Sequence, residues 1–366
     1  MDGQWIGRFE GTHEGVIVID LDDLGTNCDG VAYIFPNDQD VPGTIARIRT
    51  PNKNKKVTFN TTTLNTLDKA SELIPPHLVQ SVYPNFVFPK IAEVTLEWSD
   101  TKLNVQWKTD IGTVGAANIS RSTSTTSRTP AKKEINSWAK FKEYAHSLRP
   151  YSFIYRGQPE PDRLRTAFHR TKRTNLLRFA AEDIPALHRH LSARTSHVFD
   201  LTKALENGAF HNLIQHHGYP TPLLDWTYSP FVAAYFAFLR QPALCKGTKV
   251  RIFAFDKETW VTTFNQLQRI GPARPHFSVS EFLGIGNERM TPQQALSTIT
   301  NVDDIEAYIQ EREQERSVTY LTAIDLPRSE RVKALQELSV MGITAGSLFP
   351  GLDGACEELR GRFFGF

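Results

Sequence analysis

Apolar and polar residues alternate with a period of two in several short runs over the first 119 residues of the chain. Turn-forming residues separate these runs, as at 22–25 and 99–100. Successive side chains of a strand point to opposite faces, so the alternation predicts short antiparallel strands, and we expect an all-β barrel or sandwich over residues 1–119. The runs occupy residues 15–19, 31–35, 56–59, 92–98 and 103–107. We expect Trp5 to fill the core of this domain, and we assign the domain no ligand.

A polar segment rich in serine and threonine, residues 120–134, follows the β-rich region. It contains Pro130 and shows no apolar periodicity, which is typical of a linker. Residues 120–140 carry five basic groups and one acidic group, so contact with nucleic acid is the alternative to a solvated spacer.

The pattern then changes to a mixture of helical and strand periods, which predicts an α+β domain. Trp138, Phe141, Tyr144 and Leu148 fall at helical spacing, and the Ser-Pro pair at 229–230 precedes an apolar run that predicts a capped, buried helix. Further helices are expected at 176–206, with an interruption at Pro185, and at 303–315 and 328–341; further strands are expected at 153–155, 249–255 and 318–326.

Composition fits a globular protein of two domains. Hydrophobic residues make up 40% and charged residues 22% of the 366 residues. No apolar run approaches the roughly 20 residues of a membrane span, and the N-terminus lacks the order of a secretion signal, so we expect a cytoplasmic location. The net charge is −5 over residues 1–119 and +3 over residues 141–366, which does not favour a nucleic-acid groove.

Cysteine and histidine do not form a metal-ligand pattern. Cys28, Cys245 and Cys356 lie far apart, and we expect buried free thiols. His216 and His217 lack further ligands at a zinc spacing, but His216 is a candidate general acid or base because imidazole titrates near neutral pH. The absence of GxGxxG and GxxxxGK[ST] sequences argues against a Rossmann or P-loop nucleotide site.

The first candidate for a binding role is the sequence YRGQ at 155–158, where Arg156 and Gly157 end an apolar strand. A guanidinium there suits bidentate binding of phosphate or ribose oxygens, and glycine lets a ligand or another backbone approach closely. The alternative is a structural arginine that pairs with a core carboxylate.

The second candidate is the sequence QHHGYPTPLLDWTYSP at 215–230, which gathers polar groups just before the apolar helix. Buried hydroxyl, imidazole and carboxylate groups need partners, so they form either a structural network or a binding site. Asp225 can accept backbone N–H groups or hold Arg156 in place, and Thr227 or Ser229 can cap the helix.

Together with three further segments, these two sequences resemble the FRG domain family. The further segments are TAFHR at 166–170, NERMTPQQA at 287–295, and GI with SLFPGLDG at 342–343 and 347–354. The resemblance covers about residues 138–358, and its most specific part is the long string QHHGYPTPLLDWTYSPFVAAYFAF. The chain departs from the family pattern at Pro222, where a charged residue is usual, and at Ala295, where glycine is usual.

The FRG layout is itself similar to ADP-ribosyltransferases of the Arg…Ser-Thr-Ser…Glu type, which implies an ADP-ribosyltransferase-like fold for residues 135–366. In that type a strand-end arginine holds the phosphates or ribose of NAD, and a later Glu or Gln stabilises the ribosyl cation. The cofactor-binding residues implied here are Arg156, Gly157, Asp225, Thr227, Ser229 and Tyr235, with core packing as the alternative for Tyr235. The candidate catalytic residues are Gln293, Glu281, Glu288 and His216.

The resemblance therefore implies an NAD-dependent ADP-ribosyltransferase or NAD glycohydrolase, of the kind that acts as a toxin or antiphage effector. We expect NAD as substrate, a protein or nucleic-acid acceptor, no metal, no membrane, and a regulator or trigger bound by the N-terminal domain. The alternative is a non-catalytic protein that binds a nucleotide or nucleic acid. A carboxylate facing Arg156 and Thr227 would favour the enzyme, and its absence would favour the binding protein.

Overall fold

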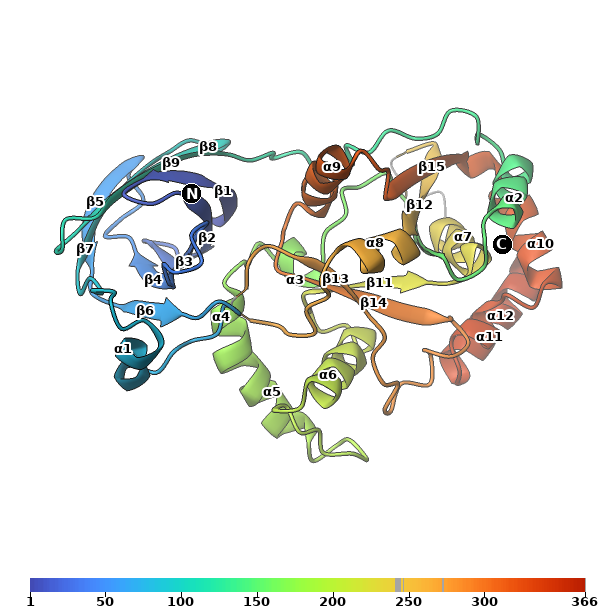
Figure 1. The fold of residues 1–366 in the computed structure, drawn as a ribbon. Coiled ribbons are helices and arrows are strands. Elements are labelled where there is room, and N and C mark those ends of the chain that lie inside the picture. The colour runs from blue at the N-terminus through green and yellow to red at the C-terminus, as the bar shows by residue number, and fades with distance from the viewer. Residues whose placement is uncertain (241–244, 246, 272, 366) are drawn as a thin grey trace.

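A computed structural model describes residues 1–240, 245, 247–271 and 273–365 of the chain (Figure 1). Nine antiparallel strands form its N-terminal part: β1 (Gly3–Gly11), β2 (Gly15–Asp23), β3 (Cys28–Pro36), β4 (Gly43–Arg49), β5 (Lys56–Thr61), β6 (Leu64–Leu67), β7 (Ala92–Trp98), β8 (Lys102–Thr109) and β9 (Val114–Ser120). Their order is β5-β7-β8-β9-β1-β2-β3-β4-β6, and the sheet curls into a nearly closed barrel. The short helices η1 (Pro76–Leu78) and α1 (Val79–Val82) lie between β6 and β7.

The barrel confirms the β class expected for residues 1–119, and β4 contacts the connection between the two edge strands, β5 and β6. The backbone N–H of Arg47 in β4 donates to the carbonyl of Thr63, between β5 and β6, at 3.0 Å. Trp5 is fully buried among the inward-facing side chains, and its indole N–H donates to the carbonyl of Met1 at 2.9 Å. It therefore fills the core, as expected.

Strands β2 and β3 are buried on both faces, which differs from a barrel whose outer face meets water. Ile17 and Ile19 point into the barrel, whereas Val18 and Tyr33 belong to a second apolar cluster on the outside. Leu177, from the C-terminal part of the chain, packs against this outer cluster. The runs at 15–19 and 31–35 are apolar at nearly every position because this side of the barrel rests on the rest of the protein.

The C-terminal part is a mixed α and β structure around a six-stranded antiparallel sheet. Its strands are β10 (Phe153–Gln158), β11 (Leu223–Thr227), β12 (Lys249–Asp256), β13 (Phe277–Ser280), β14 (Ala295–Thr300) and β15 (Leu321–Pro327). Their order is β13-β14-β11-β10-β12-β15. The helical segments are α2 (Trp138–Ser147), α3 (Ala167–Arg170), α4 (Leu176–Arg178), η2 (Phe179–Asp183), α5 (Ile184–Leu191), α6 (Ala204–His216), α7 (Pro230–Leu239), α8 (Lys257–Thr263), α9 (Ile305–Arg316), η4 (Arg328–Glu330), α10 (Arg331–Val340), α11 (Ala345–Leu348) and α12 (Leu352–Phe364).

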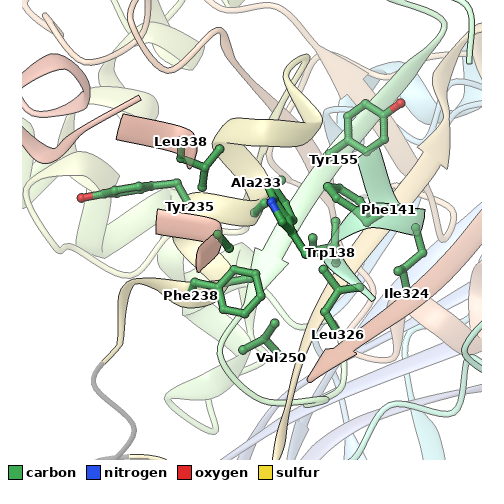
Figure 2. Close-up of a cluster of buried hydrophobic side chains, with 14 of the residues drawn as sticks. Trp138, Phe141, Tyr155, Ala233, Tyr235, Phe238, Val250, Ile324, Leu326 and Leu338 are labelled. Carbon is green, nitrogen blue, oxygen red and sulfur yellow. The ribbon is translucent and has the colours of Figure 1, made fainter. Parts of the chain in front are cut away.

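Apolar clusters cover both faces of this sheet. On one face, Trp138 of α2 and Ala233 and Phe238 of α7 pack against β12 and β15, and Leu338 of α10 closes the cluster (Figure 2). On the other face, Trp260 of α8 and residues of α9 pack against β10, β11 and β12. The sheet is therefore the middle layer of the C-terminal part.

The helix expected over 176–206 is in fact broken, but not at Pro185. Pro185 follows the π-helical turn η2 without a break in the helical backbone, because Asp183 and Ile184 keep right-handed helical φ and ψ. The helix ends instead after Leu191, and residues 192–203 form turns and irregular backbone before α6 begins at Ala204.

The segment between the two parts is largely exposed and contains no helix or strand, but it is anchored along its length. Ser127 Oγ and the backbone N–H groups of Arg128 and Thr129 donate to Glu306 Oε2 at 2.7, 2.9 and 3.0 Å. Arg251 Nη1 donates to Ser127 Oγ at 2.6 Å. Residues 120–134 therefore have the composition of a linker, but hydrogen bonds hold them against the C-terminal part, and we call this segment the strap.

Buried polar contacts join the barrel to the C-terminal part. The side-chain amide of Gln4 donates to the carbonyl of Asn301 at 2.6 Å and to Asp20 Oδ1 at 2.9 Å, and the N–H of Asp303 donates back to Gln4 Oε1 at 2.7 Å. Asp22 Oδ1 accepts the backbone N–H of Thr174 at 2.8 Å. These hydrogen bonds fix the position of the barrel relative to the C-terminal part.

Replacing Asp20 with asparagine is expected to raise the melting temperature at pH 8. Burial raises the pKa of Asp20 well above its usual value; the bond from Gln4 opposes this rise, and Asp22 and Asp303 add to it. The stability contributed by the protonated carboxyl is therefore present at low pH and is lost as the pH rises through the folded-state pKa. An amide keeps the acceptor for Gln4 and removes the buried charge.

The measurement is differential scanning fluorimetry of D20N, the exposed control D100N and the wild type at pH 5 and pH 8. The advantage of D20N should shrink as the pH falls, and D100N should show none. A melting temperature for D20N equal to or below that of the wild type at pH 8 would count against a charged, buried Asp20.

The cysteines are free thiols, but they are not all buried. Cys28 is buried in the barrel, Cys245 is half-buried, and Cys356 is exposed on α12. The expectation of buried thiols was wrong for Cys356 because α12 lies on the surface and buries only Gly354 among its described residues. Among the described residues, none of the helices combines the length and apolar character needed to cross a membrane.

Candidate functional site

The candidate site lies where the pairing between β10 and β11 is interrupted. β10 pairs with β12 over all six of its residues, but it meets β11 at a single pair, Tyr155 and Thr227. Arg156 comes directly after this pair, and its Nη1 donates to the carbonyl oxygen of Asp225 at 2.6 Å. The guanidinium thus spans the two strands at the point where their backbone pairing stops.

Arg156 carries a charge that no carboxylate neutralises directly. Its side chain is largely enclosed, and among the described residues it forms no ion pair. Burial lowers the pKa of Arg156 to about 10; the charge of Asp225 opposes this shift, and that of Arg170 adds to it. A guanidinium remains protonated at neutral pH under these conditions, so the site presents a partly desolvated cation.

Several polar groups gather around the side chain of Asp225. The amide of Gln215 donates to its carboxylate, and Gln215 Oε1 in turn accepts the hydroxyl of Thr221. Arg170, exposed at the end of α3, lies close enough for the Asp225 charge to affect its pKa. We call Arg156, Arg170, Gln215, His216 and Asp225 the Asp225 cluster.

His216 enters this cluster as a neutral imidazole. Burial lowers its pKa; Asp225 opposes the shift, and Arg289 and His217 add to it. Its Nε2 is enclosed and has no hydrogen-bond partner among the described residues. A buried ring nitrogen without a partner usually needs an explanation, but His169, His188 and His211 have the same unpaired Nε2, so it does not mark His216 alone.

Gly157 serves the approach of another backbone. A Cβ at this position would lie 1.8 Å from the carbonyl oxygen of Ala233 and 2.8 Å from the backbone nitrogen of Ala237. Both atoms belong to α7, so the glycine lets this helix pack directly on β10. Gly157 was expected to allow the close approach of either a ligand or another backbone, and the structure shows the approach of the α7 backbone.

Thr227 and Ser229 organise the turn between β11 and α7. Thr227 Oγ1 donates to the carbonyl of Gln293 at 2.7 Å and accepts the N–H of Ser229 at 3.0 Å. Ser229 Oγ accepts the N–H of Val232 at 3.2 Å and so caps α7. Both hydroxyls therefore hold the backbone of the site, and Ser229 is the helix cap that the sequence predicts.

Gln293 lies in this turn region, but its side chain points to a structural partner. It is buried, and its Nε2 donates to the carbonyl of Leu348 at 2.9 Å. The next residue, Gln294, has a left-handed φ of 46°, and Ala295 then pairs with Thr227 in the sheet. The alanine found where the FRG pattern usually has glycine is thus an ordinary strand residue.

Glu281 is the candidate carboxylate attached to the β11–α7 turn. It accepts the hydroxyl of Tyr228, and Lys257 Nζ lies 2.7 Å from that hydroxyl and 3.4 Å from Glu281 Oε1. The bond from Tyr228 lowers the pKa of Glu281; burial opposes the shift and Lys257 adds to it. Glu288 is exposed and makes no hydrogen bond or ion pair with the other described residues.

Tyr235 lies away from the Asp225 cluster and from Glu281. It is buried within α7 and belongs to the same apolar cluster as Trp138 and Phe141, with its ring pointing away from both of them (Figure 2). Burial raises its pKa to about 12, and Glu357 and Glu358 of α12 add to this rise. Tyr235 therefore faces the C-terminal helices.

The structure brings the five FRG-like segments into contact. The backbone N–H of Phe168 donates to the carbonyl of Thr221 at 3.0 Å, which joins α3 to the segment before β11. Arg289 Nη1 lies 3.4 Å from the carbonyl of His216 and its guanidinium lies 5.5 Å from the ring of Phe349. Sequence reasoning did not single out Arg170, Gln215 or Lys257, although the first two stand inside segments that it marked.

None of the described residues form a group of three or more His, Cys, Asp or Glu side chains that could hold a metal ion. Neither a curated protein nor a solved structure matches the chain. One stretch that matches a family model begins just before the strand of Arg156 and extends past the end of α7. Residues 151–244 match the protein-family model described as the FRG domain.

Proposed function

We propose that the C-terminal part binds NAD at the Asp225 cluster and breaks the bond between nicotinamide and ribose, as an ADP-ribosyltransferase or NAD glycohydrolase. The observation that carries this proposal is Arg156, an enclosed guanidinium whose short bond goes to a backbone carbonyl and which forms no ion pair among the described residues. Such a charge is costly to bury without an anion, and a phosphate supplies one.

Arg170 gives the anion a second contact. It lies near enough to affect the pKa of Arg156, and its side chain makes no hydrogen bond or ion pair with other described residues. Two guanidinium groups beside one another favour a ligand with more than one negative charge, as in the pyrophosphate of NAD. The charge of Asp225 balances part of theirs, but its carboxylate bonds to Gln215 and forms no ion pair with either arginine among the described residues.

Glu281 is the group best suited to stabilise the ribosyl cation. Its lowered pKa keeps it ionised at neutral pH, and Tyr228 attaches it to the turn that follows Thr227. When the C1′–N bond breaks, its electron pair leaves with nicotinamide and positive charge develops on the ribose, where a carboxylate acts electrostatically. Water or an acceptor nucleophile then bonds to C1′ and releases a proton.

The proposed role of the barrel is to regulate this activity by binding a trigger, as in a toxin or antiphage effector. Support comes from the direct bonds between the barrel and residues 173–175 and 301–303, which flank the FRG-like segments. The acceptor for transfer would be a protein or nucleic acid. The proposed NAD site does not depend on this role of the barrel.

A second function has its own supporting observation. Gln293 is held by Leu348, and Glu288 stands free in solvent, so two of the four candidate catalytic groups are not directed at the cluster. A protein that binds a nucleotide without cleaving it would need only Arg156, Arg170 and His216. The experiment therefore separates binding from cleavage.

The test is to incubate the full chain with NAD labelled in the nicotinamide ring and, separately, in the adenine, with and without protein and nucleic-acid acceptors. Nicotinamide release supports the enzyme, and adenine label on an acceptor identifies transfer. NAD binding by calorimetry without nicotinamide release would support the binding protein. Absence of both would refute the proposed site.

Replacing Glu281 with glutamine is expected to lower kcat for nicotinamide release by about 10²-fold, because the amide cannot stabilise the cation electrostatically. The affinity for NAD should change little, since the phosphates lie at the arginines. Glu288→Gln is the matched control, because Glu288 makes no contact with other described residues, and it should retain activity. Equal losses in both variants would remove Glu281 from the mechanism.

A further inference from the structure

The N-terminal barrel encloses an apolar cavity of about 110 Å³, independent of the candidate site in the C-terminal part. The space exists because small residues face inward on neighbouring strands. Ala32 of β3 and Ala46 of β4 are directly paired, and Ala92 of β7 lines the cavity from the other side. Larger side chains at these positions would fill the barrel as Trp5 does at its own position.

The wall of the cavity carries no Asp, Glu, Lys or Arg side chain. Three of its four threonine hydroxyls are engaged: Thr109 Oγ1 and Thr113 Oγ1 lie 2.6 Å apart, and Thr12 Oγ1 accepts the N–H of Val114 at 2.9 Å. Few polar atoms therefore remain to hold water in place, and a cavity of this chemistry favours apolar occupants.

The cavity opens at the end of the barrel where three chain segments meet. The β8–β9 turn contributes Ile111 and Val114, which are 40% and 47% exposed, and the segment before β7 contributes Phe86. His13, in the β1–β2 turn, faces the ring of Phe86 at 6.4 Å. Apolar residues at an opening let an apolar molecule enter without crossing a charged rim.

We propose that this cavity is a binding site for a small, uncharged apolar ligand that inserts an aromatic ring or a short branched alkyl group. An apolar cavity of about 150 Å³ in another protein holds benzene, so an open cavity of about 110 Å³ suits an inserted group of at most about six heavy atoms. The opening leaves room for the remainder of a larger molecule outside. The site is distinct from the proposed NAD site and does not depend on it.

The ligand class can be tested with bromobenzene, because its bromine quenches the fluorescence of an indole that it contacts. Trp107 lines the cavity and reports on occupancy. Titration of the full chain should give saturable quenching with one site, and benzene should compete. Trp107→Phe should remove the saturable component, since the other tryptophans do not line the cavity.

Two variants that fill the cavity test its position. Ala46→Leu is expected to weaken bromobenzene binding by at least about tenfold, because the added group occupies the cavity volume. Ala32→Val, a smaller change on the paired strand, should weaken binding to a lesser degree. Ala116→Leu adds the same side chain on the outer face of β9 and should leave binding unchanged.

Circular dichroism and melting temperature establish that each variant is folded. If Ala46→Leu fails to fold, Ala32→Val and the Trp107 signal still decide the outcome. Quenching that does not saturate, or that persists equally when the cavity is filled, would overturn the proposal. Loss of NAD cleavage without loss of quenching would concern only the C-terminal site.

Discussion

Replacing Arg156 with alanine is expected to lower kcat/KM for NAD cleavage by about 10³-fold, the largest effect on activity that the structure predicts. The guanidinium is the enclosed cation of the Asp225 cluster, and its Nη1 bridges β10 to the carbonyl of Asp225. Without it the phosphates of NAD lose their main counter-charge, and Arg170 alone, which is exposed, cannot replace it.

The loss must be distinguished from a change in the fold, because Arg156 also bonds to the backbone of β11. Arg156→Lys keeps the charge but cannot form the planar, bidentate contact, and we expect it to recover only part of the activity. Arg149→Ala is the matched control: it removes an arginine just before β10 whose side chain is 77% exposed. It should retain full activity.

Three measurements decide the matter: nicotinamide release, NAD affinity by calorimetry, and melting temperature. A phosphate-binding role predicts weaker NAD affinity for Arg156→Ala at a nearly unchanged melting temperature. If the melting temperature falls sharply and the surviving folded protein binds NAD normally, Arg156 is a structural residue and the proposed function loses its main support.

Replacing Glu306 with alanine is expected to destabilise the protein by about 3–5 kcal/mol. Glu306 is 1% exposed, and its carboxylate accepts five hydrogen bonds. Four come from residues 127–129 of the strap between the two parts, and the fifth comes from the backbone N–H of Leu164. The substitution would leave these donors without an acceptor in a largely enclosed place.

The expected fall in melting temperature is about 10 °C, given about 2–4 °C per kcal/mol for a domain of this size. The fall in melting temperature for Glu306→Gln should be intermediate, because the amide oxygen still accepts hydrogen bonds but the amide nitrogen, itself a donor, faces other donors. Glu315→Ala is the control on the same helix, where the carboxylate pairs with Arg312 in an exposed position. It should cost less than about 1 kcal/mol.

Limited proteolysis gives an independent readout of the same bonds. Trypsin should cut after Arg128 or Lys132 faster in Glu306→Ala than in the wild type, because the strap loses its anchor. An unchanged cleavage rate together with an unchanged melting temperature would show that the strap is held by other contacts, such as the bonds from Arg251 to Ser127 and Thr129.

The elements that the sequence predicted well are those whose signals are local. The period-two runs became β2, β3, β5, β7 and β8, and the Ser-Pro pair at 229–230 begins α7. Local chemistry also decided the cap at Ser229, since a serine hydroxyl bonds to the N–H three residues later. These features need only a few neighbouring residues to form.

The elements that the sequence did not predict depend on distant partners. The double burial of β2 and β3 follows from their contact with Leu177, more than 140 residues away in the chain. The break at 192–203 and the exposure of Cys356 likewise depend on which surfaces other segments leave uncovered. The secondary-structure propensity of a short stretch of sequence carries no information about which surfaces distant segments will cover.

For the candidate site, the sequence by itself indicated which segments hold the candidate groups: YRGQ, with its strand-end arginine, and LLDWTYS, with its carboxylate and hydroxyls. Only the tertiary structure decided how these groups are used. It brought Arg170 and His216 close enough to Asp225 for their charges to interact, and it bonded the side chain of Gln293 to the carbonyl of Leu348. It also packed α7 against Gly157 and bonded Glu281 to the hydroxyl of Tyr228. The physical reason is that a side chain's partners are set by the packing of whole strands and helices, and that packing minimises exposed apolar area and unpaired polar groups over the entire chain.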